Sequence, residues 1–183
     1  DILSGLVGSE MCIETGTQHA PQHRHTRIVI TLDDGRDLRF LDQRTFGGLT
    51  LAPLVDGIPG PVTHIAPDPF EECFDVDEVA RRLCARRSAI KRSLLDQTLV
   101  SGIGNIYADE TLWRVRCHPE TPCSRLSQSE AVELLQTACD VMAEAMSQGG
   151  TSFDSLYVNV NGESGWFSRV LDAYGREDEP ATE

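Results

Sequence analysis

Hydrophobic and polar residues alternate in two short stretches near the start of the chain. Residues 27–32 and 37–40 form these stretches, and Asp33-Asp34-Gly35-Arg36 lies between them. An Asp-Gly pair between alternating stretches is a strong signal for a β-hairpin, because glycine readily adopts the positive φ of a tight turn. The pattern therefore predicts an antiparallel sheet in this part of the chain.

The region from Leu49 to Phe74 shows no steady periodicity. Five prolines interrupt it, and each proline fixes φ and removes a backbone donor. We interpret the region as a linker between two domains. Its prolines are Pro53, Pro59, Pro61, Pro67 and Pro69.

Helical spacing of apolar residues begins after this linker. Asp75 is the predicted N-cap of a first helix, with Glu78 as the second member of a capping box. Ser127 and Glu130 give the same signature at the start of a long helix, and residues 88–95 predict a shorter helix between the two. The apolar stripe of the long helix consists of Leu134, Leu135, Ala138, Met142 and Met146.

The change from strand-like to helix-like periodicity predicts an α+β chain with three regions. We assign residues 1–66 to the remainder of a β-sandwich and residues 67–148 to a four-helix unit. In residues 149–183 the helical pattern stops, and a polar, glycine-bearing loop begins.

Two glycines one residue apart precede the third predicted helix. Gly102 and Gly104 allow a tight turn and a close approach to another molecule, and Asn105 is the predicted N-cap of the helix. The start of a helix presents free N–H groups and the positive end of the helix dipole, which suit a phosphate. The turn is therefore a candidate anion-binding site. An ordinary glycine-rich connection is the alternative, because an isolated motif of this kind is weak.

Local charge favours the anion-binding interpretation. The chain of 183 residues has a formal net charge of -13, yet residues 81–92 contain basic side chains and no acidic one. A reversal of charge in an acidic chain indicates a surface for a polyanion. Lys91, the only lysine in the chain, belongs to this run. A solvated helix face is the alternative for a basic run taken alone.

The sequence around this turn resembles the helix-two-turn-helix of bacterial formamidopyrimidine-DNA glycosylases. The resemblance rests on Lys91-Arg92-Ser93-Leu94-Leu95-Asp96-Gln97 and on Gly102-Ile103-Gly104-Asn105-Ile106-Tyr107-Ala108-Asp109-Glu110, and it extends from about Asp33 to Pro180. It implies the α+β fold of these enzymes, a partial β-sandwich followed by a helix-two-turn-helix domain. It also implies base-excision repair by a DNA glycosylase and AP lyase that recognises oxidised purines such as 8-oxoguanine in double-stranded DNA.

The resemblance also implies roles for particular residues. Asp42-Gln43-Arg44-Thr45-Phe46-Gly47 is similar to the wedge that fills the space of an extruded base. An extended segment would place the arginine and the aromatic ring on one side, although a packing role for the ring is the alternative. The loop that closes over the base matches residues 151–165, for which a plain connection is the alternative. The predicted DNA-binding residues are Lys91, Gly102, Gly104, Asn105, Arg44 and Phe46, and the predicted lesion-loop residues are Thr151, Ser152, Tyr157, Asn159 and Asn161.

We expect no catalytic residue in these 183 residues. The family's nucleophile is an N-terminal proline followed by glutamate, which this sequence does not match, and the only amines here are Lys91 and the terminus at Asp1. The family also contains a four-cysteine zinc finger after the region that ends here with Glu179-Pro180. Zinc is therefore expected in the full-length family, whereas no cofactor or metal site is expected in this chain, whose six cysteines lack Cys-x-x-Cys spacing.

Three interpretations stay open from the sequence. The first is part of a glycosylase whose active centre is encoded upstream, and the second is a catalytically inactive relative that only binds damaged or abasic duplex DNA. The third is a helical interaction domain whose glycine turn contacts protein. The sequence has neither an apolar run of membrane-spanning length nor a signal-peptide pattern, so we expect a cytoplasmic monomer with no membrane partner.

Overall fold

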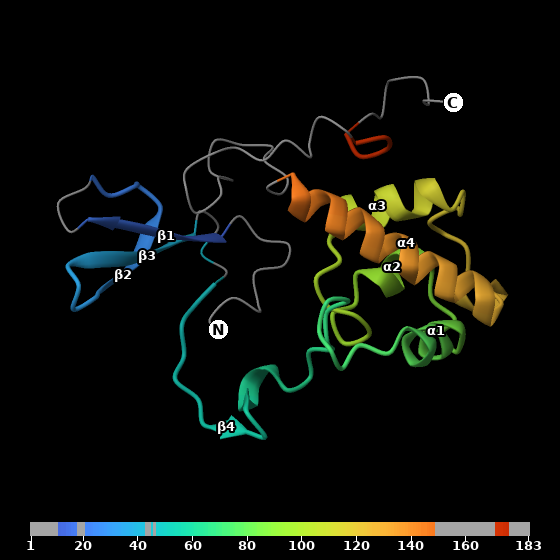
Figure 1. Cartoon of the computed structure of the whole chain (residues 1–183), viewed down its shortest axis with the longest axis horizontal. Coiled ribbons are helices and arrows are strands. Elements are labelled where there is room, and N and C mark those ends of the chain that lie inside the picture. Colours follow the sequence, from blue (N-terminus) through green and yellow to red (C-terminus); the bar gives the residue numbers. More distant parts are fainter. Residues whose placement is uncertain (1–10, 18–20, 43–44, 46, 149–170, 176–183) are drawn as a thin grey trace. The chain divides into compact units, whose positions relative to one another are not determined.

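The structure, a computed structural model, describes residues 11–17, 21–42, 45, 47–148 and 171–175 (Figure 1). The chain divides into two compact units, Asp1–Leu51 with Gly149–Ser168 and Ala52–Gln148 with Arg169–Glu183. The described residues contain both sheets and helices, which confirms the predicted α+β class. The domain boundaries expected at residues 66 and 148 stay predictions.

The first unit contains a three-stranded antiparallel sheet. Its strands are β1 (Met11–Thr17), β2 (Thr26–Thr31) and β3 (Arg36–Asp42), in the order β1-β3-β2. The predicted hairpin between β2 and β3 is confirmed, with Gly35 at φ 82 in its turn. The central strand β3, which pairs on both edges, is more buried than β2.

A small hairpin lies within the proline-rich region. It consists of β4 (Leu54–Val55) and β5 (Ile58–Pro59), and a short 3-10 helix, η1 (Gly60–Val62), follows it. Asp56 and Gly57 both have positive φ (52 and 84), as a type I′ turn requires. The linker interpretation missed this hairpin because each strand has only two residues, too few for a periodicity.

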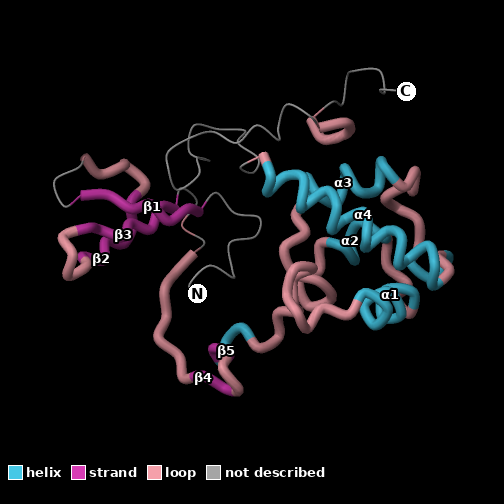
Figure 2. The backbone as a smooth tube through the Cα atoms, in the orientation of Figure 1, coloured by secondary structure: helices cyan, strands magenta, loops and turns pink. Residues whose placement is uncertain are grey.

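The described residues of the second unit form four α-helices in addition to the small hairpin (Figure 2). These are α1 (Val76–Cys84), α2 (Ile90–Leu94), α3 (Asn105–Arg114) and α4 (Gln128–Ser147), with a 3-10 helix, η2 (Cys123–Arg125), before α4. The long helix α4 packs against α1 and α3, and α2 packs against α3. None of the helices among the described residues is long and apolar enough to cross a membrane.

A single apolar cluster holds the four helices together. The predicted stripe of α4 is confirmed except at Met146, which is 61% exposed, whereas its neighbour Ala145 is fully buried. Three residues between α2 and α3 are fully buried, so the connection is part of the core. The cluster includes Val79, Ala80, Leu83, Ile90, Leu94, Leu99, Val100, Ile103, Ala108, Leu112, Leu134, Leu135, Ala138 and Met142.

The N-caps follow the sequence signals in part. Ser127 and Glu130 form the predicted capping box of α4. The Asp75 carboxylate accepts from the backbone N–H groups of Asp77 and Glu78, which confirms the cap of α1. The Glu78 side chain, however, pairs with Arg81, one turn further along the helix. The expected capping box of α1 is therefore replaced by a cap and an ion pair.

Candidate nucleic-acid interface

The connection between α2 and α3 is held by the side-chain amide of Gln97. Its Nε2 donates to the carbonyl oxygens of Leu95 and Ile103, both at 3.1 Å, and its Oε1 accepts from the backbone N–H of Gly102 at 2.9 Å. Both ends of the turn are thus tied to one side chain. Backbone bonds from Ala66 N–H to Gln97 O and from Ser101 N–H to Pro67 O attach the proline-rich segment to the same turn.

The two glycines of the turn have different structural roles. Gly102 has φ +86, so the position needs glycine for its backbone conformation, and a Cβ there would also lie 3.0 Å from the flexible end of Met142, Cε. Gly104 has an extended backbone (φ -100, ψ -176), and a Cβ there would meet nothing within 4 Å. The space beside Gly104 is therefore open to another molecule.

The prediction that Asn105 caps α3 is wrong. The N-cap is Gly104, and Asn105 is the first helical residue, so its side chain is not placed to accept from the N–H groups of the first turn. Within the described part of the chain no side chain caps this helix. The start of α3 therefore keeps its positive dipole end and its N–H groups for an external acceptor, beside the exposed Asn105.

Lys91 is paired with a residue of α3 one turn after this helix start. Its backbone N–H donates to Pro119 O at 3.2 Å, and its Nζ lies 2.7 Å from Oδ1 and 2.9 Å from Oδ2 of Asp109. Asp109 is four residues after Asn105 in α3, so the two share one face of the helix. Lys91 thus contacts α3 through Asp109, one turn after Asn105, and the sequence alone predicted no role for Asp109. The DNA-binding roles of Lys91, Asn105 and the Gly102–Gly104 turn stay predictions.

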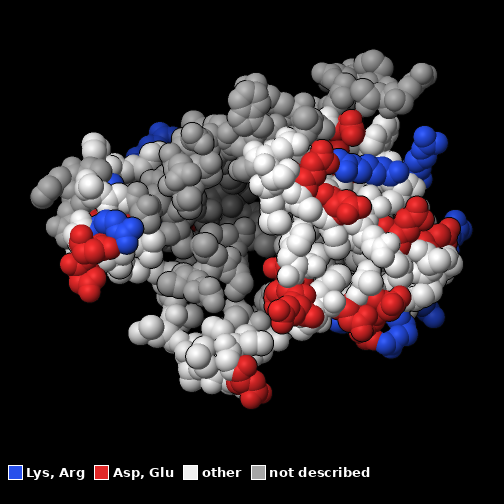
Figure 3. All heavy atoms as spheres, in the orientation of Figure 1, with Lys and Arg blue, Asp and Glu red and all other residues white. Residues whose placement is uncertain are grey.

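Most of the basic run is engaged by the chain itself. Arg81 pairs with Glu78, Arg86 pairs with Asp96 at 2.5 Å, and Arg82 Nη2 donates to Thr98 O at 2.8 Å. Figure 3 shows acidic side chains in several groups on the visible face, with basic ones beside them. Two exposed cations of the run, Arg87 and Arg92, form no ion pair among the described residues. Fewer basic side chains of the run are therefore available to an external anion than the sequence alone predicts.

Asp96 shapes the first residues of the turn. Its carboxylate accepts from the hydroxyl and the backbone N–H of Thr98 and pairs with Arg86, and these bonds lower its pKa to about 2, the Thr98 hydroxyl contributing most. A carboxylate that accepts several hydrogen bonds is stabilised in its charged form. The ionised side chain thus joins the end of α1 to the turn before Gly102.

Glu110 anchors a distant segment to α3. Its side chain is fully buried, and its two oxygens accept from the backbone N–H groups of Asp172, Ala173 and Tyr174, each at 2.9 Å. A buried carboxylate requires such partners, because an unpaired one would lose its hydration without compensation. The sequence signal was an acid next to apolar helix positions, but its partners lie more than 60 residues away.

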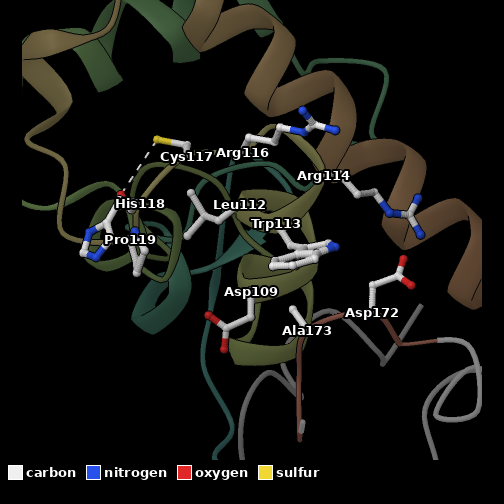
Figure 4. A pocket seen from close by; sticks show the side chains of 10 residues that line it. All are labelled: Asp109, Leu112, Trp113, Arg114, Arg116, Cys117, His118, Pro119, Asp172 and Ala173. Atoms are coloured by element: carbon white, nitrogen blue, oxygen red, sulfur yellow. Dashed lines mark hydrogen bonds between the residues drawn. The ribbon is translucent and has the colours of Figure 1, made fainter. Parts of the chain in front are cut away.

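A pocket of about 940 Å³ lies along the second half of α3 (Figure 4). The chain leaves α3 with Arg116 at φ 54; Arg116 N–H donates to Trp113 O and Cys117 N–H to Leu112 O, the hydrogen bonds of a Schellman motif. Glycine is the usual residue at that position. The pocket is lined by Asp109, Leu112, Trp113, Arg114, Arg116, Cys117, His118, Pro119, Asp172 and Ala173.

The predicted wedge and lesion loop fall on residues that the structure does not describe. Arg44, Phe46 and the five predicted residues from Thr151 to Asn161 lie outside the described residues. Between the two wedge residues, Thr45 has φ 58, so the expected extended alternation is wrong at this point. The buried Asp42 carboxylate accepts from Thr45 N–H at 2.8 Å and from Gly47 N–H at 2.7 Å.

Comparisons of sequence identify relatives of this chain. The profile described as "Formamidopyrimidine-DNA glycosylase H2TH domain" matches residues 65–156. A formamidopyrimidine-DNA glycosylase of Mycolicibacterium vanbaalenii is 60% identical over 164 residues, which cover 87% of this chain and 56% of the relative. One of a Nocardioides species is 51% identical over 182 residues, covering 98% and 62%. The chain thus spans little more than half the length of these relatives.

Solved structures show the same fold. The complex of Lactococcus lactis Fpg with DNA containing an abasic site has a TM-score of 0.79 and 29% identity, covering 95% of this chain and 64% of that one. A variant of that protein in complex with DNA containing Fapy-dG gives a TM-score of 0.80. Among the described residues no group of three or more His, Cys, Asp and Glu could hold a metal ion.

Proposed function

This chain belongs to the formamidopyrimidine-DNA glycosylase family, and we propose that it binds duplex DNA for the excision of oxidised purines, such as 8-oxoguanine, in base-excision repair. It contributes backbone binding and lesion recognition, while the covalent chemistry of the glycosylase and AP lyase requires an amine nucleophile. We propose that it acts as a monomer in the cytoplasm.

The convergence at the start of α3 supports this proposal most strongly. A helix start without a side-chain cap, an open backbone at Gly104 and the ammonium of Lys91 all offer donors or positive charge to one anion. A DNA phosphate has the charge and the acceptor oxygens that such donors require. These contacts carry no sequence information, which suits a protein that searches for lesions.

The lesion itself would be engaged by Arg44 and Phe46, with the loop that contains Thr151, Ser152, Tyr157, Asn159 and Asn161. The relatives in complex with abasic-site and Fapy-dG DNA support this choice of substrate class. Extrusion of a damaged base costs unstacking energy, which an inserted aromatic ring and arginine offset in part.

The experiment is a binding titration of the 183-residue chain on a labelled duplex with one abasic site, read by fluorescence anisotropy at several salt concentrations. The double variant Lys91→Met, Asn105→Ala should bind at least tenfold more weakly. Its slope of log K against log [salt] should be shallower by about 0.9, one phosphate contact. Arg36→Met removes an exposed cation that pairs with Asp34 in the sheet, and it should leave both quantities near the wild-type values.

Equal affinity of the wild type and the double variant, with both folded by circular dichroism, would exclude the helix start as the DNA contact. An equal loss of affinity in Arg36→Met would show that only total charge matters.

A further inference from the structure

The only lysine of the chain is already paired with a carboxylate before any DNA is present. The Nζ atom of Lys91 lies within hydrogen-bond distance of both oxygens of Asp109, at 2.7 and 2.9 Å. Their side chains are only 31% and 26% exposed. The pair is thus partly withdrawn from water. Opposite charges interact more strongly in such a partly buried environment than on an open surface.

The position of Asp109 gives this pair a meaning for binding. Asp109 lies one helical turn after Asn105 on the same face of α3, and Lys91 is fixed by its backbone bond to Pro119. A phosphate that contacted both Lys91 and the helix start would have to bring its oxygens to the ammonium that Asp109 now occupies. The carboxylate and the phosphate are therefore alternative partners of one cation.

We propose that Asp109 is an internal substitute for a DNA phosphate and that it limits the affinity and the salt dependence of this interface. This inference rests on the proposed function. While the ion pair is closed, Lys91 and Asp109 together carry no net charge, so they release few counterions from DNA. Binding at Lys91 then requires that the phosphate displaces the carboxylate or shares the ammonium with it.

The structure offers the displaced carboxylate a polar environment. Asp109 lines the pocket along α3, together with the basic side chains of Arg114, Arg116 and His118 (Figure 4). A carboxylate released into this open, partly cationic pocket keeps its hydration, so the exchange does not strand a buried charge. The exchange is therefore feasible within the folded unit.

The test compares Asp109→Asn with a charge-matched control on the same duplex. Glu144→Gln also removes a carboxylate that pairs with a cation of α3, Arg114 at 2.7 Å, but it does not contact Lys91. We expect Asp109→Asn to bind roughly three- to tenfold more tightly than Glu144→Gln. Its slope of log K against log [salt] should also be steeper, by less than the roughly 0.9 of one whole phosphate contact, because the ammonium no longer divides its charge between the carboxylate and the phosphate. Asp109→Ser serves as a second variant if the asparagine variant is not folded by circular dichroism.

The dependence on Lys91 separates this inference from the proposed function. In a Lys91→Met background, Asp109→Asn should behave as Glu144→Gln does. If Lys91→Met weakens binding but Asp109→Asn does not strengthen it beyond Glu144→Gln, this inference is wrong and the proposed function stands. Weaker binding by Asp109→Asn would show that the carboxylate orients the lysine for phosphate and would also overturn the inference. If Lys91→Met has no effect on binding, both fail.

Discussion

The two glycines of the turn provide a test in which folding and binding separate. Alanine at Gly102 would have to adopt φ +86 and place its Cβ 3.0 Å from Cε of Met142. Alanine at Gly104 can keep the extended backbone, and its methyl group meets no atom within 4 Å. Each variant therefore adds a single methyl group, and the two sites are two residues apart. We expect Gly102→Ala to affect folding and Gly104→Ala to affect binding.

The expected stability changes follow from these geometries. A left-handed conformation costs a residue with a Cβ about 1–2 kcal/mol, and the flexible end of Met142 can move away from the added methyl group at little further cost. Gly102→Ala should therefore lower the free energy of unfolding by about 1–2 kcal/mol. At Gly104, alanine loses about 0.5–1 kcal/mol as a poorer N-cap and gains about 0.4–1 kcal/mol by restricting the unfolded chain. These two effects nearly cancel.

Binding should show the reverse order of sensitivity. The methyl group at Gly104 occupies the open space through which a phosphate would reach the N–H groups of the helix start. Loss of one charge-assisted hydrogen bond, about 1.5–3 kcal/mol, weakens binding roughly tenfold or more. Circular dichroism melting gives the stability, and anisotropy on the abasic duplex gives the affinity. A Gly104→Ala variant with wild-type affinity would refute the argument that DNA approaches the backbone at this residue.

Two further predictions concern the middle of α3 and the turn that follows it. Glu110→Gln should lower the free energy of unfolding by roughly 1–3 kcal/mol in denaturant titrations, because a neutral amide cannot replace a buried carboxylate that accepts three backbone N–H groups. The exposed control Glu133→Gln should change this free energy by less than about 0.5 kcal/mol. Equal effects of the two would exclude the anchor. Arg116→Gly should stabilise the fold by about 1 kcal/mol and so raise the melting temperature, because glycine adopts φ 54 without strain. Arg116→Ala keeps the strained backbone and should not raise the melting temperature. Stabilisation by both variants would show that the cost comes from the arginine side chain and not from the backbone.

The sequence predicts those features whose signals are local. The hairpin between β2 and β3, the cap of α1, the capping box of α4 and the glycine turn before α3 each depend on residues within a few positions of one another. Each is determined by backbone conformation or by one turn of helix, so a short motif is sufficient evidence. The cap of α3 was misplaced by one residue, because both glycine and asparagine are common N-caps.

The sequence does not predict the partners of the charged residues. Lys91 and Asp109 are 18 positions apart, and Glu110 and the segment that it anchors are more than 60 apart. Such pairs depend on how the helices pack, and no periodicity encodes them. The basic run is an example. Its charges alone predict a broad cationic surface, whereas Arg81, Arg86 and Lys91 are paired with carboxylates of the chain itself.

The packing of the turn supports its proposed role as a binding surface. Leu99, Val100 and Ile103 are fully buried, and they lie between the tie at Gln97 and the open backbone at Gly104. A connection anchored by its own apolar side chains has already lost its conformational freedom on folding, so little ordering is left to oppose binding. Phosphate contacts made by a fixed backbone also keep their geometry whatever the base sequence. The hydrophobic core of the helical unit, rather than the number of basic residues, therefore accounts for the proposed DNA-binding surface in a chain with a net charge of -13.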